Sequence, residues 1–159
     1  MRTSPLKTAA TAATNEAATT LHIERIFDAP IERVFQAWTD PSHLAKWWGP
    51  KNCSSEILHL DLRPGGRWET IINTGDCDVH QVGGEYVEIS QPHRLVFTWA
   101  WVKDGVPGHQ TQVSIDLETL GEKTRMVFRQ DVFESVAMRN QHDGGWQSSF
   151  ECLGDHLAG

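Results

Sequence analysis

The sequence lacks the signatures of several large classes of protein. No stretch approaches the roughly 18 consecutive apolar residues that a membrane-spanning helix requires. Basic side chains are scarce: 14 lysines and arginines face 21 aspartates and glutamates, and the formal net charge of −7 argues against nucleic acid or an anionic membrane as the main partner. The nucleophile-elbow, P-loop and dinucleotide-binding fingerprints are also missing. The sequence therefore contains none of these catalytic or nucleotide-binding motifs.

Cysteine is rare as well. The three cysteines, Cys53, Cys77 and Cys152, are odd in number and far apart in the sequence, which makes a poor disulfide framework. We therefore expect a protein of the reducing cytoplasm. Cys152 falls within the last predicted helix, and we interpret it as a buried, inert thiol rather than a nucleophile.

The first 19 residues are mostly alanine, threonine and other small residues. They contain no apolar segment of the kind found in secretory signals. We predict a disordered tail over residues 1–19, while Arg2 and Lys7 leave an organelle transit peptide as the less favoured alternative. The remaining residues, 20–159, have the length of one domain with a substantial core.

A strand followed by two short helices is predicted at the start of this domain. Apolar and polar residues largely alternate from Leu21 to Phe27, which is the period of a strand. After Pro30, which suits a first helical turn, apolar residues recur at helical spacing as far as Trp38. Ser42 can cap a second short helix, which Gly49-Pro50 ends.

The middle of the chain, from about Cys53 to Gln130, has the alternation and the turn residues of five or six strands. The strongest strand signal runs from Arg94 to Val102. Gly83-Gly84 suggests a bulge or a sharp bend in the preceding strand, because glycine weakens a flat strand. Residues 112–119 and 123–131 are predicted to pair as a hairpin.

The chain ends in a predicted helix for which Asp143 is the expected cap. Trp146, Phe150, Leu153 and Leu157 form its apolar stripe, at spacings of four, three and four residues. We therefore expect an α+β fold, in which one curved antiparallel sheet of about six or seven strands wraps around the C-terminal helix.

Tryptophan is abundant, with seven residues in the chain. Several indole rings could point into the space between sheet and helix: Trp68, Trp99, Trp101, Trp146 and one of Trp47 and Trp48. Large rings that meet at angles leave gaps, and gaps lined by aromatic side chains bind small ligands. The alternative is that these rings simply fill the core.

Several segments together resemble the family of activator-of-heat-shock-protein-90 ATPase homologues, a branch of the START-like superfamily (SRPBCC) that also holds polyketide cyclases. The matching segments are Asp28–Pro41, Leu44–Pro50, Arg63–Trp68, Gly84–Ile89, Pro92–Trp99 and Gly145-Trp146 ahead of Leu153. The resemblance implies a helix-grip fold, with a curved sheet gripping the C-terminal helix and a cavity between them. It implies no universal catalytic residues.

On this basis we expect the ligand-binding cavity to be lined by Trp68, Tyr86, Glu88, Phe97, Trp99, Trp101, Trp146, Phe150 and Leu153. The charged strand residues Glu88, Asp116 and Arg129 can be interpreted in two ways. If they point inward, they must pair or bind a polar group of the ligand, because burying a lone charge is costly. If they point outward, they are ordinary surface.

A candidate metal site is formed by Asp76, Cys77, Asp78 and His80. Zinc requires about four converging ligands, and the nearest candidates for a second cluster, Cys53 and His59, have no ligand-pair spacing. A solvated hairpin tip explains the acidic pair equally well, so we predict neither a metal nor another cofactor.

A candidate general base with a carboxylate partner is formed by His109, His142 and Asp143, which could meet at one end of the cavity. However, Asp143 already serves as the expected helix cap, and histidines in loops are mostly solvated. We therefore assign no catalytic residue.

The function we expect from the sequence is binding of an apolar or aromatic small molecule between the sheet and the C-terminal helix. One alternative is a cyclase- or dehydratase-like enzyme that uses the same cavity. The other is a co-chaperone-like interaction domain, linked to the stress response, that acts on an ATPase of the heat-shock-protein-90 type. A homodimer is possible in any of these cases, since exposed strand edges invite pairing.

Overall fold

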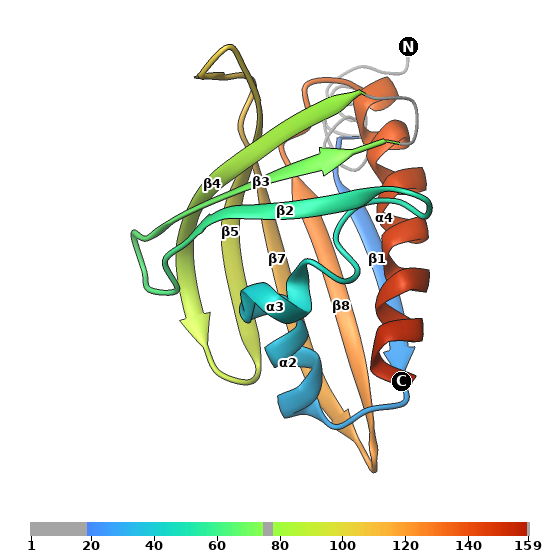
Figure 1. Ribbon diagram of the computed structural model, residues 1–159. Helices are drawn as coiled ribbons and strands as arrows, with labels where there is room; N and C mark the ends of the chain where they lie inside the picture. Colours follow the sequence, from blue (N-terminus) through green and yellow to red (C-terminus); the bar gives the residue numbers. More distant parts are fainter. Residues whose placement is uncertain (1–18, 75–77, 159) are drawn as a thin grey trace, which may run out of the picture.

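The chain folds into one curved antiparallel sheet that surrounds a long C-terminal helix (Figure 1). The computed structural model describes residues 19–74 and 78–158, so the predicted tail before Thr19 lies outside the described residues. The strands are β1 (Leu21–Phe27), β2 (Ser54–Leu60), β3 (Arg67–Asn73), β4 (Val79–Ser90), β5 (Arg94–Lys103), β6 (Val106–Pro107), β7 (Thr111–Leu120) and β8 (Lys123–Asp131). The helices in the same ranges are α2 (Ile31–Thr39), α3 (Pro41–Leu44) and α4 (Val136–Ala158).

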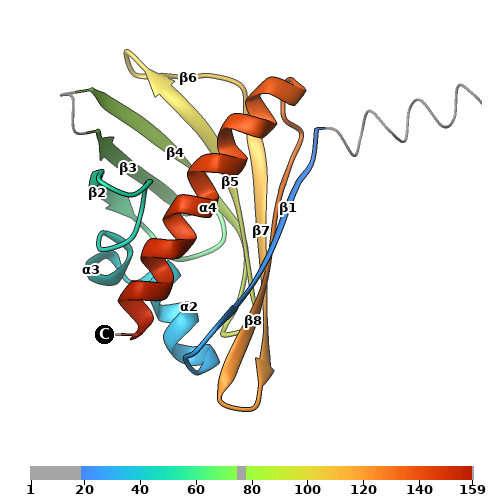
Figure 2. The ribbon, with the colours of Figure 1, turned by 90° about the vertical axis from the view of Figure 1, so that its right-hand side faces the viewer.

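The strands follow the order β1-β8-β7-β5-β4-β3-β2, and the short β6 pairs with β5 outside this path. Figure 2 shows the sheet bent into a trough with α4 lying inside it, and α2 and α3 filling the end where α4 finishes. This is the helix-grip architecture expected from the sequence. The strand number is slightly higher than predicted, because β6 is a two-residue strand that sequence patterns do not register.

The first strand and α2 form as their patterns predict. Leu21, Ile23 and Phe27 are buried in β1, and Pro30 stands immediately before the first residue of α2. The side chain of Arg25 contacts α4: its Nη2 donates a hydrogen bond of 2.7 Å to Oε1 of Gln147. This contact ties the first strand of the sheet to the last helix.

The prediction for the second helix was wrong in its cap and its end, because α3 ends at Leu44 and its cap is Asp40, whose side chain accepts a hydrogen bond from the backbone N–H of Ser42.

The prediction of a bulge at Gly83-Gly84 was wrong in its position. The pairing of β4 with β5 shifts between Tyr86 and Glu88 instead. Gly84 is required for another reason, since a Cβ atom there would lie 2.0 Å from the carbonyl oxygen of Thr98 on β5. The glycine therefore permits a close approach between neighbouring strands.

The last helix begins earlier than predicted, at Val136. Ser135 supplies the cap, since its Oγ accepts a hydrogen bond of 3.1 Å from the backbone N–H of Met138. Asp143 therefore lies inside α4, where its carboxylate accepts a hydrogen bond from Nε2 of Gln147. The predicted apolar stripe is confirmed, because Trp146, Phe150, Leu153 and Leu157 are all buried.

No helix in the described ranges has both the length and the apolar character needed to cross a membrane.

Candidate functional site

A pocket lies between the first half of α4 and the adjoining ends of β3, β4 and β5. Its volume is about 480 Å³, within the range typical of small-molecule sites. The lining residues are Trp48, Gly49, Pro50, Ile72, Thr74, His80, Trp99, Trp101, Gln141, His142, Gly145, Trp146 and Ser149. None of these described residues is Asp, Glu, Lys or Arg. The described part of the wall is therefore mainly apolar and has no permanently charged side chain.

Four indole rings form most of the wall, and they come from three parts of the chain. Trp48 follows α3, Trp99 and Trp101 share one face of β5, and Trp146 belongs to α4. The ring centroid of Trp99 lies 5.6 Å from that of Trp48, 5.5 Å from that of Trp101 and 5.0 Å from that of Trp146. Tilted and edge-on contacts at these distances are favourable, and they leave the remaining ring faces available to a ligand.

Buried hydrogen bonds hold two of these rings in place. The indole N–H of Trp146 donates to Oε1 of Gln130 (2.8 Å), and Nε2 of Gln130 donates to Oγ1 of Thr111 (2.8 Å). Thr111 in turn donates to the carbonyl oxygen of Trp99 (3.2 Å). On the other wall, the N–H of Trp48 donates to Oγ1 of Thr70 (2.9 Å). Because the indole donors of Trp146 and Trp48 both have acceptors, these two rings keep one arrangement without a ligand.

His142 also lines the pocket, and both of its ring nitrogens are engaged. Trp101 can only donate through its N–H, so Nε2 of His142 must accept that hydrogen bond (3.1 Å). The proton therefore sits on Nδ1, which donates to the carbonyl oxygen of Met138 (2.8 Å). Burial lowers the pKa of His142, in agreement with a neutral ring. In this arrangement His142 has no free nitrogen with which to accept a proton from a substrate.

The other two members of the predicted general-base group do not join His142 in the pocket. His109 is exposed, and its Nε2 contacts the backbone oxygen of Val132. Asp143 is bonded to Gln147 on its own helix. The structure thus does not assemble a base with a carboxylate partner from these three residues.

The nine residues predicted to line the cavity separate into three groups. Trp99, Trp101 and Trp146 do line the pocket. Glu88 lies elsewhere, on the outer surface. The other five are buried but belong to the packed core rather than to the pocket wall: Trp68, Tyr86, Phe97, Phe150 and Leu153.

The helices α2 and α3 fill the end of the trough in which Phe97 and Phe150 lie (Figure 2), whereas Trp68 packs behind the pocket wall, 5.8 Å from Trp48 and from Trp99. Trp38 of α2 packs its ring against Phe97 (6.3 Å) and Phe150 (6.0 Å). Tyr86 packs against Phe97 at 6.2 Å, and burial raises the pKa of its hydroxyl. The sequence placed Trp38 among the apolar residues of the first predicted helix, but it did not show how much of the trough this ring occupies.

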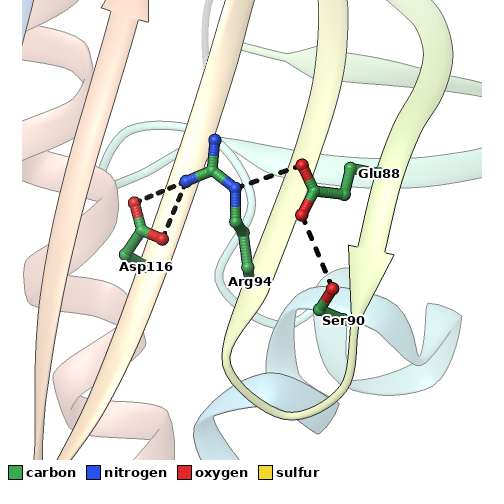
Figure 3. Close-up of polar contacts among 4 residues, drawn as sticks. All are labelled: Glu88, Ser90, Arg94 and Asp116. Carbon is green, nitrogen blue, oxygen red and sulfur yellow. Dashed lines mark hydrogen bonds and ion pairs between the residues drawn. The ribbon is translucent and has the colours of Figure 1, made fainter.

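Glu88 projects from the outer face of the sheet (Figure 3). Its carboxylate accepts a hydrogen bond of 3.3 Å from Nε of Arg94, and Nη1 of Arg94 donates to both carboxylate oxygens of Asp116 at 2.8 Å. The register shift after Tyr86 explains this position: Tyr86 pairs with Phe97, which points inward, whereas Glu88 pairs with Val96, the next position along β5. Of the two interpretations of this charge, the outward one is correct.

Only part of the candidate metal site lies among the residues that the structure describes. Asp76 and Cys77 lie outside the described residues, and Asp78 and His80 are exposed. The His80 ring lies at the pocket rim, 6.0 Å from that of Trp101. Within residues 19–74 and 78–158 no three side chains of the ligand type come together. The unpaired thiols of Cys53 and Cys152 are partly buried.

Sequence reasoning missed the part of the pocket that comes from small and polar residues. Gly145 and Ser149 lie one turn apart on the α4 wall, and Ile72 and Gly49 lie opposite. A Cβ atom at Gly145 would meet only Pro50, at 3.9 Å, so this glycine leaves space that a larger side chain would occupy. In the sequence, Gly144 and Gly145 only lower the helix propensity of this segment, and nothing local shows that Gly145 faces a cavity.

Comparisons with known proteins agree with this fold. A family model described as activator of Hsp90 ATPase homolog 1-like protein matches residues 28–158. Among solved structures, protein CV1439 from Chromobacterium violaceum is 28% identical with a TM-score of 0.78, and the match covers 87% of this chain and 96% of that one. The AHSA1 protein from Silicibacter pomeroyi is 27% identical with a TM-score of 0.80, covering 87% of this chain and 97% of that one.

A search of curated proteins finds no match. The family model nevertheless spans most of the chain, from the start of the first helix region to the end of α4. Together with the sheet that grips its last helix, this match shows that the chain belongs to the family of activator of Hsp90 ATPase homolog 1-like proteins, within the START-like group of folds.

Proposed function

We propose that the protein binds an apolar or aromatic small molecule in the pocket between α4 and the ends of β3 and β5. The observation that carries this proposal is the cavity of about 480 Å³ with four tryptophan rings in its wall and no charged side chain among its described lining residues. Sites of this size that are mostly apolar and have a few polar groups are typical of ligand binding.

The fixed positions of the rings also favour binding. A ligand gains affinity by removing its own apolar surface and that of the wall from water, at about 25 cal/mol per Å². Part of that gain is lost whenever side chains must be ordered on binding. Here the hydrogen bonds of Trp146, Trp48 and Trp101 already fix three of the rings. The ordering cost is therefore small, and more of the apolar gain remains as affinity.

The experiment is to fill the pocket from α4. Gly145→Leu places a side chain in the pocket, whereas Gly144→Leu adds the same side chain at an exposed position with no neighbour within 4 Å. Each protein is screened by thermal shift against a panel of lipids, flavonoids and polyketides, and native mass spectrometry looks for a co-purified molecule. We expect compounds that stabilise the parent and Gly144→Leu but not Gly145→Leu. A flat response of the parent across the panel, with no co-purified molecule, would contradict the proposal.

A second candidate is interaction with an ATPase of the heat-shock-protein-90 type. Its support is the description of the family, which names activation of such an ATPase. The test is a pull-down with the cognate chaperone and a measurement of its ATPase rate with and without the protein. An unchanged rate and no retained chaperone would leave the ligand-binding proposal alone. The cyclase- or dehydratase-like alternative has less support, because both nitrogens of His142 are occupied and Glu88 points outward.

A further inference from the structure

The α4 wall of the pocket carries a hydroxyl group that has no hydrogen-bond partner within residues 19–74 and 78–158. Ser149 is only 3% exposed and lines the pocket one turn after Gly145. A serine inside a helix often donates to the carbonyl oxygen four residues earlier. Ser149 makes no such bond, nor any other side-chain hydrogen bond to the part of the chain that the structure describes. The oxygen of Ser149 is not among the fully covered unpartnered polar atoms, so it keeps some accessible surface, and a molecule bound in the pocket can supply the hydrogen-bond partner that it lacks.

The other polar side chains at the pocket already have a partner in the protein, are exposed to water, or are covered by protein atoms. His142 uses both ring nitrogens within the protein, and Thr74 also has interactions of its own. Gln141 and His80 are exposed at the rim, where water can reach them. The indole N–H of Trp99 has no partner among the described residues, but protein atoms cover it. Ser149 is therefore the buried polar group that a bound molecule can satisfy.

The charge of the wall limits the ligand further. The described lining residues include no carboxylate, ammonium or guanidinium group, and His142 is held neutral by its two hydrogen bonds. A charged group that entered the pocket would lose its water without gaining a partner, which is strongly unfavourable. The part of the ligand that reaches Ser149 is therefore uncharged.

We infer, on the basis of the proposed function, that the ligand is a neutral ring compound whose hydroxyl or carbonyl group forms a hydrogen bond with Oγ of Ser149 while its ring lies against the tryptophan wall. The hydroxyl of Ser149 can donate or accept, so it suits either group. It selects a phenol or a ketone over a hydrocarbon, and the uncharged wall excludes a carboxylate.

Three probes with the same ring system distinguish the effects of the ring, the hydroxyl group and a negative charge. They are naphthalene, 2-naphthol and 2-naphthoate, each at pH 7. Isothermal titration calorimetry measures their affinities for the parent protein and for Ser149→Ala. We expect 2-naphthol to bind about fivefold more tightly than naphthalene, as one net hydrogen bond provides. We expect 2-naphthoate to bind at least about tenfold more weakly than 2-naphthol, since its carboxylate has no partner in the pocket. Ser149→Ala should remove the advantage of 2-naphthol and leave the affinity for naphthalene unchanged.

The control is Ser148→Ala, which removes a hydroxyl from the same helix outside the pocket lining. The oxygen of Ser148 accepts a hydrogen bond from the backbone N–H of Lys51, so this variant should keep the preference for 2-naphthol. Circular dichroism confirms that both variants are folded, and alanine is well suited to a helix. The indole N–H signals of Trp99, Trp101 and Trp146 in NMR spectra show whether each probe enters the pocket.

The outcomes distinguish the two proposals. If none of the three probes shifts the indole signals or binds, the proposed function is contradicted for ligands of this kind. If naphthalene binds but 2-naphthol gains nothing from Ser149, the role of the hydroxyl is overturned while binding in the pocket stands. If 2-naphthoate binds as tightly as 2-naphthol, the requirement for a neutral ligand is overturned.

Discussion

Gln130 is a polar side chain with no exposed surface, and it links the pocket wall to the sheet. Its amide accepts from Trp146 and donates to Thr111. We predict that Gln130→Leu lowers the free energy of unfolding by about 1–3 kcal/mol, because the indole N–H of Trp146 is left buried without an acceptor. Urea denaturation measures the change.

The matched control for this substitution is Gln112→Leu. Gln112 is exposed on β7, so the same change there should alter the free energy of unfolding by no more than about 0.5 kcal/mol. If the two substitutions changed the free energy of unfolding equally, the buried hydrogen bonds of Gln130 would not be what stabilises the protein at this position.

His142 makes the stability of the protein depend on pH. Burial lowers its pKa in the folded state below the ordinary value of 6.5. As the pH falls through 6.5, the unfolded chain therefore takes up a proton before the folded protein does, and the free energy of unfolding decreases. At higher pH both states are neutral and the full stability is present.

We predict that the melting temperature falls between pH 7.5 and pH 5 and that His142→Leu reduces this slope. Burial, followed by the neighbouring charge of His43, also lowers the pKa of His156, so part of the slope remains in the variant. Differential scanning calorimetry across this range gives the measurement. A slope that is unchanged or steeper in the variant would refute the role of His142.

The close contact between β4 and β5 leaves no room for a side chain at Gly84. A Cβ atom at Gly84 would lie 2.0 Å from the oxygen of Thr98, which is backbone and cannot turn away. We predict that Gly84→Ala lowers the free energy of unfolding by about 2–3 kcal/mol or prevents folding, because the two strands must separate locally. Thermal denaturation followed by circular dichroism shows the effect.

Gly144→Ala in α4 is the opposite case and serves as the control. No atom lies within 4 Å of a Cβ at this exposed position, so the substitution should raise stability by roughly 1 kcal/mol through the helix propensity of alanine. If Gly84→Ala were tolerated as well as Gly144→Ala, the close approach of β4 and β5 would not be a real constraint.

At the scale of the whole molecule, one part of the trough of the sheet is filled by packed side chains and another part contains the pocket. The helices α2 and α3 fill one end, and the pocket occupies the other, beside the first half of α4. A ligand bound there joins β3, β5 and α4, so binding is coupled to global unfolding. A concentration 100 times the Kd should stabilise the protein by about 2.7 kcal/mol.

We predict a rise in melting temperature of about 5–10 °C at that concentration, from the usual response of a domain of this size. Scanning calorimetry at several ligand concentrations checks it, and Gly145→Leu should show no rise. A rise of the same size in Gly145→Leu would place the ligand outside this pocket.

The outer face of the sheet shows what sequence patterns could and could not reveal at this scale. Alternation predicted which strands exist, and Trp99 and Trp101 were correctly placed on one inner face. Glu88 was misplaced, because the register shift after Tyr86 has no signal in the local sequence. A shift of one residue moves a side chain to the other face of a sheet, so a single bulge decides whether a carboxylate is buried or forms an ion pair in water.

The sequence by itself determined the order of the elements, the apolar stripe of α4 and the membership of the family, because these depend on periodicity and on residues that are close along the chain. Only the tertiary structure decided which tryptophans line a pocket and which fill the core. Trp99 and Phe97 are two positions apart on one face of β5, yet the first borders the pocket and the second packs against Trp38. That difference arises from α2, whose position over the sheet is fixed by contacts between distant parts of the chain.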